Sequence, residues 1–191
     1  MSMQELENSS DAELFSLLKN EDETAKKAFT ILYSRYASRV YAYCRRFLGN
    51  KEEAQDVFQE TFIRFYQSAK QDREMTNLPA FLLTISRNLC VNAKRKEKSM
   101  VDFESVIFPD NNETTNLNDK KELLELIKRA LELLPDEYKE MFILREYDGL
   151  SYQEIADVTG NSIATVKIRI FRAKQKIREI LAPYLSDLSK Y

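Results

Sequence analysis

Basic residues near the C-terminal end of the sequence are grouped around two large apolar ones. Positions 163 to 181 contain six lysines or arginines and a single acid. At 100° per residue, Ile168 and Phe171 fall on the same helical face as Arg172. A DNA major groove accepts apolar contacts at thymine methyl groups, and basic side chains reach its phosphates and base edges. The pattern predicts a DNA-binding helix; the alternative is a solvated basic helix whose two apolar residues pack elsewhere on the protein.

Residues 51–69 carry a face of the opposite charge. That face holds Glu53, Asp56, Glu60, Ile63 and Gln67, and the opposite face is apolar. An acidic face with one apolar residue inside it suits a basic protein partner better than DNA. On the pattern alone, however, an ordinary solvated helix face is favoured over a docking surface.

A second basic group lies between positions 84 and 98. Arg87, Lys94 and Lys98 gather on one helical face, where they could follow the phosphates of a nucleic-acid strand. A solvated charged face explains the same pattern equally well. Asn88 and Asn92, four residues apart, either pair with each other or contact a nucleobase, and the structural pairing is favoured.

Composition excludes several classes of site. The sequence contains no His and only two Cys, so His-based catalysis, His metal sites and four-thiolate zinc sites are excluded. No Gly-rich phosphate loop or nucleophile–base pair is visible. We expect no enzyme activity, no cofactor and no metal. The polar N-terminus is unlike a signal peptide, and no apolar run approaches the roughly 18 residues of a membrane helix, so we expect a cytoplasmic protein without membrane insertion.

The elements that carry these groups are predicted to be helices. Gly and Pro number only three and four, which favours an all-α chain over strand-rich architectures. Capping signals and breakers predict helices after Ser10 and over about 22–48, 51–69, 79–98, 119–134 and 136–146. The helix that starts at Pro79 is expected to bury Phe81, Leu82, Ile85 and Leu89.

A helix-turn-helix follows these elements. Ser151 and Glu154 have capping-box spacing, Gly160 supplies a tight turn, and Ser162 can cap a second helix. The buried stripe of that second helix is expected to comprise Ile163, Val166, Ile170, Ala173, Ile177 and Ile180.

The stretch between the two halves differs in composition. Positions 99 to 119 hold five acids, no base and no helical period. We interpret it as an interdomain linker, since long structureless loops are uncommon inside compact domains; the alternative is a surface loop within one domain. The predicted organisation is two small helical domains, 1–98 and 119–191, joined by a flexible acidic linker, 99–118.

The helix-turn-helix segment, 134–179, resembles region 4 of the bacterial extracytoplasmic-function (ECF) sigma factors. In that family region 4 binds the −35 promoter element and touches the flap of the RNA polymerase β subunit. The resemblance assigns seven DNA-facing positions: Arg145, Ser162, Ala164, Lys167, Ile168, Phe171 and Arg172. Ile168 departs from the small polar residue often found at its position, so the promoter sequence may differ from that of other members.

The segment DVFQETFIRFY, 56–66, resembles the region 2 helix that docks on the clamp helices of the polymerase β′ subunit. The family makes this contact through Asp56, Gln59, Glu60 and Ile63. The segment 79–96 resembles the part of region 2 that melts DNA and contacts the −10 element, which assigns Arg87, Asn88, Lys94 and Lys98 to the strand. The loop 71–79 would capture the flipped −10 base. Phe81 stands where Trp is common, and Asn92 where an acid is common.

The resemblance implies a sigma factor that binds core RNA polymerase and promoter DNA, with an anti-sigma factor as regulator. Its acidic linker would thread toward the RNA exit channel of the polymerase. The main alternative is a stand-alone helix-turn-helix regulator, which would be dimeric. A further alternative is an interaction module that only sequesters an anti-sigma factor.

Overall fold

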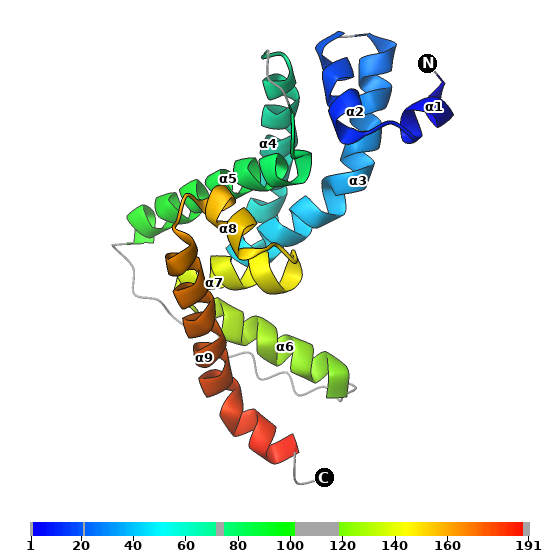
Figure 1. Ribbon diagram of the computed structural model, residues 1–191. Coiled ribbons are helices and arrows are strands. Elements are labelled where there is room, and N and C mark those ends of the chain that lie inside the picture. The colour runs from blue at the N-terminus through cyan, green and yellow to red at the C-terminus, as the bar shows by residue number, and fades with distance from the viewer. Residues whose placement is uncertain (1, 21, 72–74, 102–118, 189–191) are drawn as a thin grey trace. The chain divides into compact units, whose positions relative to one another are not determined.

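The protein folds into two helical units. The structure, a computed structural model, describes residues 2–20, 22–71, 75–101 and 119–188 (Figure 1), and every regular element in these ranges is a helix. The chain divides into compact units Met1–Lys94 and Arg95–Tyr191. An all-α, two-domain architecture is thereby confirmed, while the limits 1–98 and 119–191 stay predictions.

The first unit contains α1 to α4 and the part of α5 that ends at Lys94. Their bounds are Met3–Glu7 (α1), Asp11–Leu17 (α2), Glu23–Leu48 (α3), Lys51–Ala69 (α4) and Leu78–Val101 (α5), with a 3₁₀ turn at Leu18–Asn20. The helix α1 was not expected from the sequence. It is five residues long, too short to show a period, but its Leu6 is fully buried.

The helices α3 and α4 form a hairpin whose ends are set by short-range bonds. Asp22 caps α3 by accepting from the backbone N–H of Ala25, at 2.8 Å. Gly49 ends α3 with φ +80°, a conformation that side-chain-bearing residues adopt rarely. Asn50 then accepts from the N–H groups of Glu52 and Glu53 to begin α4. These bonds explain why both ranges were predictable from the sequence.

Aromatic rings fix the rotation of α4 against α3. Between ring centroids, Phe62 is 4.7 Å from Tyr33 of α3 and Phe58 is 5.5 Å from Tyr41 of α3, while Phe65 contacts Phe15 of α2 at 5.5 Å. Such ring pairs stabilise a contact beyond the area they bury. With this face held inward, the opposite face of α4 is turned to solvent.

The buried face of α5 differs from the prediction. Leu82 is buried as expected, but Phe81, Ile85 and Leu89 are only half-buried. The buried stripe continues instead through Leu83, Ser86 and Cys90. Ser86 enters the core because its hydroxyl donates to the Leu83 carbonyl within the helix. Since α5 has apolar residues on several sides, its period alone did not define the centre of the buried face.

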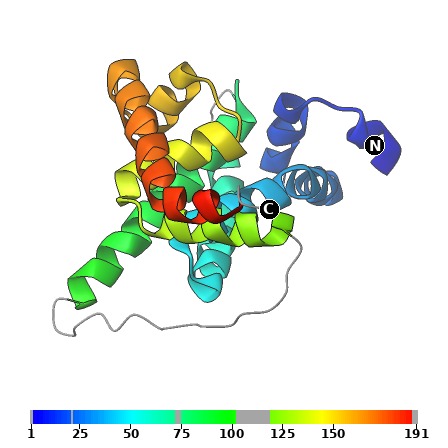
Figure 2. The same cartoon turned by 90° about the horizontal axis from the view of Figure 1, so that it is seen from below.

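The second unit contains α6 to α9. Their bounds are Asp119–Glu132 (α6), Asp136–Phe142 (α7), Tyr152–Thr159 (α8) and Ile163–Leu188 (α9), with a π-helical turn at Ile143–Tyr147. Figure 2 shows α6, α7 and α8 gathered along the long α9, which runs from orange to red. The expected helix over 136–146 is thus two pieces, α7 and the π turn.

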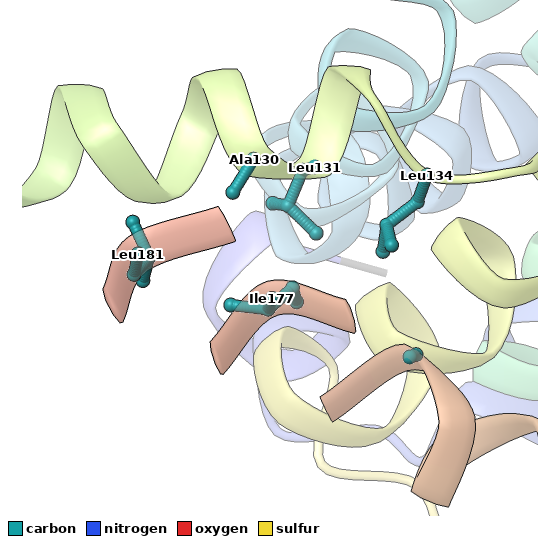
Figure 3. Close-up of a cluster of buried hydrophobic side chains, with 6 residues drawn as sticks. Ala130, Leu131, Leu134, Ile177 and Leu181 are labelled. Carbon is teal, nitrogen blue, oxygen red and sulfur yellow. The ribbon is translucent and has the colours of Figure 1, made fainter. Parts of the chain in front are cut away.

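The core of this unit joins α6 to α9. Ala130, Leu131 and Leu134 face Ile177 and Leu181 (Figure 3). Of the predicted α9 stripe, Val166, Ile170, Ala173 and Ile177 are buried and Ile180 is half-buried.

Ile163 is the exception to that stripe, because 39% of it is exposed and the prediction of a core position was wrong. It is the first residue of α9. The helical period places Ile163 on the buried side of α9. The period does not indicate whether the helices that pack on α9 extend as far as its first residue.

Three predicted features lie wholly or partly outside the described residues. Residues 102–118, most of the predicted linker, are among them, although α5 continues to Val101. The same holds for residues 72–74 of the loop assigned to base capture and for the side chain of Lys98.

Candidate nucleic-acid and polymerase interfaces

The turn between α8 and α9 is held by the predicted residues. The Ser151 hydroxyl accepts from the Glu154 N–H at 3.2 Å, and the Glu154 carboxylate accepts from the Ser151 N–H at 2.7 Å. Gly160 adopts the left-handed conformation, with φ +69°. Ser162 caps α9 by accepting from the Thr165 N–H at 3.1 Å. Local hydrogen bonds therefore set the angle at which α9 leaves the turn.

The outward face of α9 presents apolar and basic side chains together. Phe171 is 68% and Ile168 52% exposed, and Ala164, Lys167 and Arg172 are exposed beside them. No described part of the protein covers Ile168 or Phe171, which contradicts the alternative in which they pack internally. Two large exposed apolar side chains among lysines and arginines fit a nucleic-acid groove.

Arg145 reaches this surface from the π-helical turn. Its Nη1 donates to the Leu150 carbonyl at 2.7 Å, and its guanidinium carbon lies 4.7 Å from the ring centroid of Tyr152. The Nζ of Lys167 is 5.6 Å from the same centroid. Sequence analysis overlooked Tyr152; its place directly after the Ser151 cap is the only local signal, and its contacts depend on the π turn.

Two bases of α9 are tied to acids of other elements. Arg169 pairs with Glu137 at 2.7 Å and also donates to Asn161 at 3.1 Å, while Lys174 pairs with Glu146 at 2.7 Å. These bases are half-buried and stabilise the packing of α9. Arg172 is exposed, with its Nη1 3.3 Å from the Tyr138 hydroxyl. The basic group therefore divides into members that pair with acids of other elements and members that stay exposed.

The acidic face of α4 is exposed as its spacing predicts. Asp56, Gln59 and Ile63 are exposed, Ile63 to 51%, and the half-buried Glu60 pairs with Arg64 one turn on at 2.6 Å. An open groove of about 480 Å³ adjoins this face, lined by Lys26, Phe29, Thr30, Phe62, Ile63, Tyr66 and Gln67. At its edge the hydrogen bond from Lys26 to Glu23 raises the pKa of the lysine.

The residues assigned to strand contact are less open. Arg87 and Lys94 are half-buried on α5, whereas Asn88 and Asn92 are exposed. The Asn88 side-chain oxygen accepts from Arg87 Nη1 at 3.3 Å. The structure thus links the Asn88 side chain to the neighbouring arginine, Arg87.

The described residues contain neither a cluster of metal-ligating side chains nor a membrane-spanning helix. Nowhere in those ranges do three or more His, Cys, Asp or Glu side chains gather as metal ligands. None of the described helices combines the length and apolar character that crossing a bilayer requires.

Comparison with known proteins finds a matching family in each half of the chain. The family described as Sigma-70 region 2 matches residues 32–100, and the family described as Sigma-70, region 4 matches residues 124–177. The ECF RNA polymerase sigma factor SigE of Mycolicibacterium smegmatis is 31% identical over 88% of this chain and 67% of its own length. The RNA polymerase sigma-H factor of Pseudomonas aeruginosa is 31% identical over 85% of this chain and 90% of its own.

The chain belongs to the ECF RNA polymerase sigma factors. Its fold agrees with solved sigma factors. The sigma factor RpoE of Bartonella quintana, solved with the anti-sigma factor NepR, matches with a TM-score of 0.65 and 27% identity over 82% of this chain and 98% of that one. CnrH, solved with the cytosolic domain of CnrY, has the same fold, with a TM-score of 0.68 and 22% identity over 92% and 99%.

As an ECF sigma factor, the protein binds core RNA polymerase and promoter DNA and directs promoter-specific transcription initiation. Sigma factors are not enzymes as a family. The region 4 match contains the helix-turn-helix, and the region 2 match contains α4 and all but the last residue of α5. A stand-alone regulator would not account for region 2, so the sequence-based identification is confirmed.

Proposed function

We propose that the sigma factor divides its contacts between the two exposed helix faces of opposite charge. The face of α4, through Asp56, Gln59, Glu60 and Ile63, docks on the clamp helices of the β′ subunit. The face of α9 docks on the −35 element. The observation that carries this proposal is the exposure of a large apolar residue at the centre of each charged face.

On the −35 element, the apolar and basic side chains have different roles. Ile168 and Phe171 contact thymine methyl groups and sugar edges, which specify sequence. Arg145, Lys167 and Arg172 contact phosphates or base edges, while Ser162 and Ala164 allow the start of α9 to approach the groove closely. The exposure of Lys167, Ile168, Phe171 and Arg172 on one face of α9 supports this assignment.

At the −10 element, α5 contacts the displaced strand. We assign Arg87, Lys94 and Lys98 to its phosphates and Asn88 to a base or sugar edge. Binding unpaired bases in this way offsets the cost of unstacking them. The bond from Arg87 to Asn88 supports a shared role, because each side chain limits the torsions of the other.

The wider organisation follows from these contacts. We propose residues 1–98 as region 2, 99–118 as linker and 119–191 as region 4, which also touches the β flap. The protein acts in the cytoplasm, where polymerase and promoter DNA are found, without catalysis or cofactor. An anti-sigma factor regulates it; the Bartonella quintana relative in complex with NepR supports this assignment.

Run-off transcription with cognate core polymerase and a promoter library tests the proposal. The wild type should initiate at a defined subset of sequences, and Asp56→Ala/Glu60→Ala should weaken initiation at all of them. The control, Glu52→Ala/Gln55→Ala, alters two exposed positions of α4 outside the docking set and removes one acid. If the double variant initiates like the wild type, the docking face is wrong. If only a dimer of the free protein binds duplex DNA, the stand-alone regulator is correct.

A further inference from the structure

Two cationic side chains from different elements lie against the ring of Tyr152. It is the first residue of α8, directly after the Ser151 cap, and 36% of it is exposed. The Arg145 guanidinium carbon lies 4.7 Å from its ring centroid and the Lys167 Nζ 5.6 Å. Arg145 comes from the π-helical turn and Lys167 from α9. Both distances are within the range in which a ring face attracts a cation.

The ring supplies what these two cations otherwise lack. Arg145 is held at a second point by the Leu150 carbonyl, at 2.7 Å, which restricts its long side chain. Lys167 forms no ion pair with any described residue, and its Nζ lies over the Tyr152 ring. Two like charges close together repel, and the negative face of an aromatic ring reduces that repulsion.

We infer that Tyr152 is a positioning residue for −35 recognition, holding Arg145 and Lys167 at the DNA-facing surface before DNA arrives. The inference rests on the proposed role of the α9 face. Arginine and lysine side chains lose much rotamer freedom when they bind a phosphate or base edge. Restricting them in the free protein lowers that loss, so the ring strengthens binding without itself contacting DNA.

Two other roles for Tyr152 make different predictions. A direct bond from its hydroxyl to a phosphate would need the oxygen but not the ring. A purely structural role would lower the stability of the helix-turn-helix but would not change how many phosphates the protein contacts. The number of phosphate contacts is measured by the salt dependence of the affinity.

The experiment uses holoenzyme assembled from core polymerase and the full-length chain. The probe is a fluorescent duplex carrying a promoter enriched in the run-off selection, and its affinity is measured over a series of salt concentrations. Tyr152→Leu removes the ring, Tyr152→Phe keeps the ring without the hydroxyl, and Tyr184→Leu is the control at an exposed tyrosine of α9. The melting temperature of each free variant is recorded alongside.

We expect Tyr152→Leu to weaken binding about tenfold and to lower the salt slope by about one. Tyr152→Phe should rescue the affinity to within about twofold of wild type, and Tyr184→Leu should stay within the same limit. In an Arg145→Gln/Lys167→Gln background, Tyr152→Leu should add less than about twofold, because the cations on which it acts are gone.

Three results would overturn the inference. They are wild-type affinity and salt slope in Tyr152→Leu, equal losses in Tyr152→Phe and Tyr152→Leu, and a full tenfold loss that persists without the two cations. Each presupposes that wild-type holoenzyme binds the selected promoter. Failure of the wild type to select any promoter would instead refute the proposed function, and the inference with it.

Discussion

The exposed faces of α4 and α9 resemble each other in build and differ in charge. Each belongs to a helix whose other side is buried, and each exposes one isoleucine to nearly the same extent, Ile63 to 51% and Ile168 to 52%. Ile63 lies on the helical face that carries Asp56 and Glu60, whereas Ile168 lies on the face that carries Lys167 and Arg172. The exposed apolar residue indicates that a partner covers the face, and the surrounding charge indicates which kind of partner it is.

The two faces also differ in what holds their charged side chains. On α4, Glu60 pairs with Arg64 of the same helix. At the α9 face, Arg172 contacts Tyr138 of α7, and Lys167 contacts Tyr152 of α8. The α4 face therefore depends on a single helix, while the α9 face depends on the packing of the whole unit. Substitutions can distinguish a face that is held within one helix from a face that is held by contacts with other helices.

The largest effect is expected from reversing a charge on the α4 face. Glu60→Lys should weaken binding to core polymerase about 100-fold, because it reverses the charge of an acid that this face presents to its partner. Glu52→Lys makes the same change of charge at another exposed position of α4 and should change affinity less than about threefold. Binding of labelled core polymerase measures both variants. Similar losses in the two would show that the effect is one of net charge alone.

The apolar centre of the α9 face should give the next largest effect. Phe171→Ala should weaken promoter binding by holoenzyme about 20-fold, since a large side chain no longer leaves water on binding. Its melting temperature should equal that of wild type, because 68% of Phe171 is already exposed. A drop in melting temperature without loss of promoter affinity would place Phe171 in the core instead.

Two arginines of α9 should respond differently to the same substitution. Arg172→Gln should lower promoter affinity about fivefold and the salt slope by about one. Arg169→Gln should leave the slope unchanged and lower the free energy of unfolding by about 0.5–1 kcal/mol, because it breaks the pair with Glu137. Affinity titrations and denaturant unfolding distinguish them; equal salt slopes would refute the division between structural and DNA-facing bases.

The smallest effect is expected away from both faces. Burial and the hydrogen bond to Asp11 raise the pKa of Tyr36 from 10.0 to about 12. Because the folded pKa is the higher one, this stabilisation is fully present below about pH 10 and is lost as the pH rises toward 12. Tyr36→Phe should lower the free energy of unfolding at pH 7 by about 1 kcal/mol.

Absorbance titration at alkaline pH checks the tyrosine directly. The difference between wild type and Tyr36→Phe should show one late-titrating phenol. Polymerase and promoter affinities should match those of wild type, since Tyr36 belongs to neither face. A phenol that titrates near pH 10 would show that its bond to Asp11 is not maintained in solution.

Much of the fold was predictable because its signals are local. The capping boxes at Ser10 and Ser151 and the helix end at Gly49 involve residues at most four positions apart. Helical period also predicted the exposed face of α4, since one side of that helix is clearly apolar. The same method failed for α5, where apolar residues on several sides left its rotation open, and for the short α1.

By itself the sequence determined the helix-turn-helix, the two charged faces and the family, because helical periods, caps and motifs depend on residues that are close together in the sequence. The tertiary structure alone decided which basic side chains of α9 pair with acids and which stay exposed. Arg172 meets Tyr138 across 34 positions, and Arg169 meets Glu137 from another helix. The tertiary structure also brought Arg145 and Lys167 to one ring. Contacts between residues far apart in sequence depend on how helices pack, and no helical period contains that information.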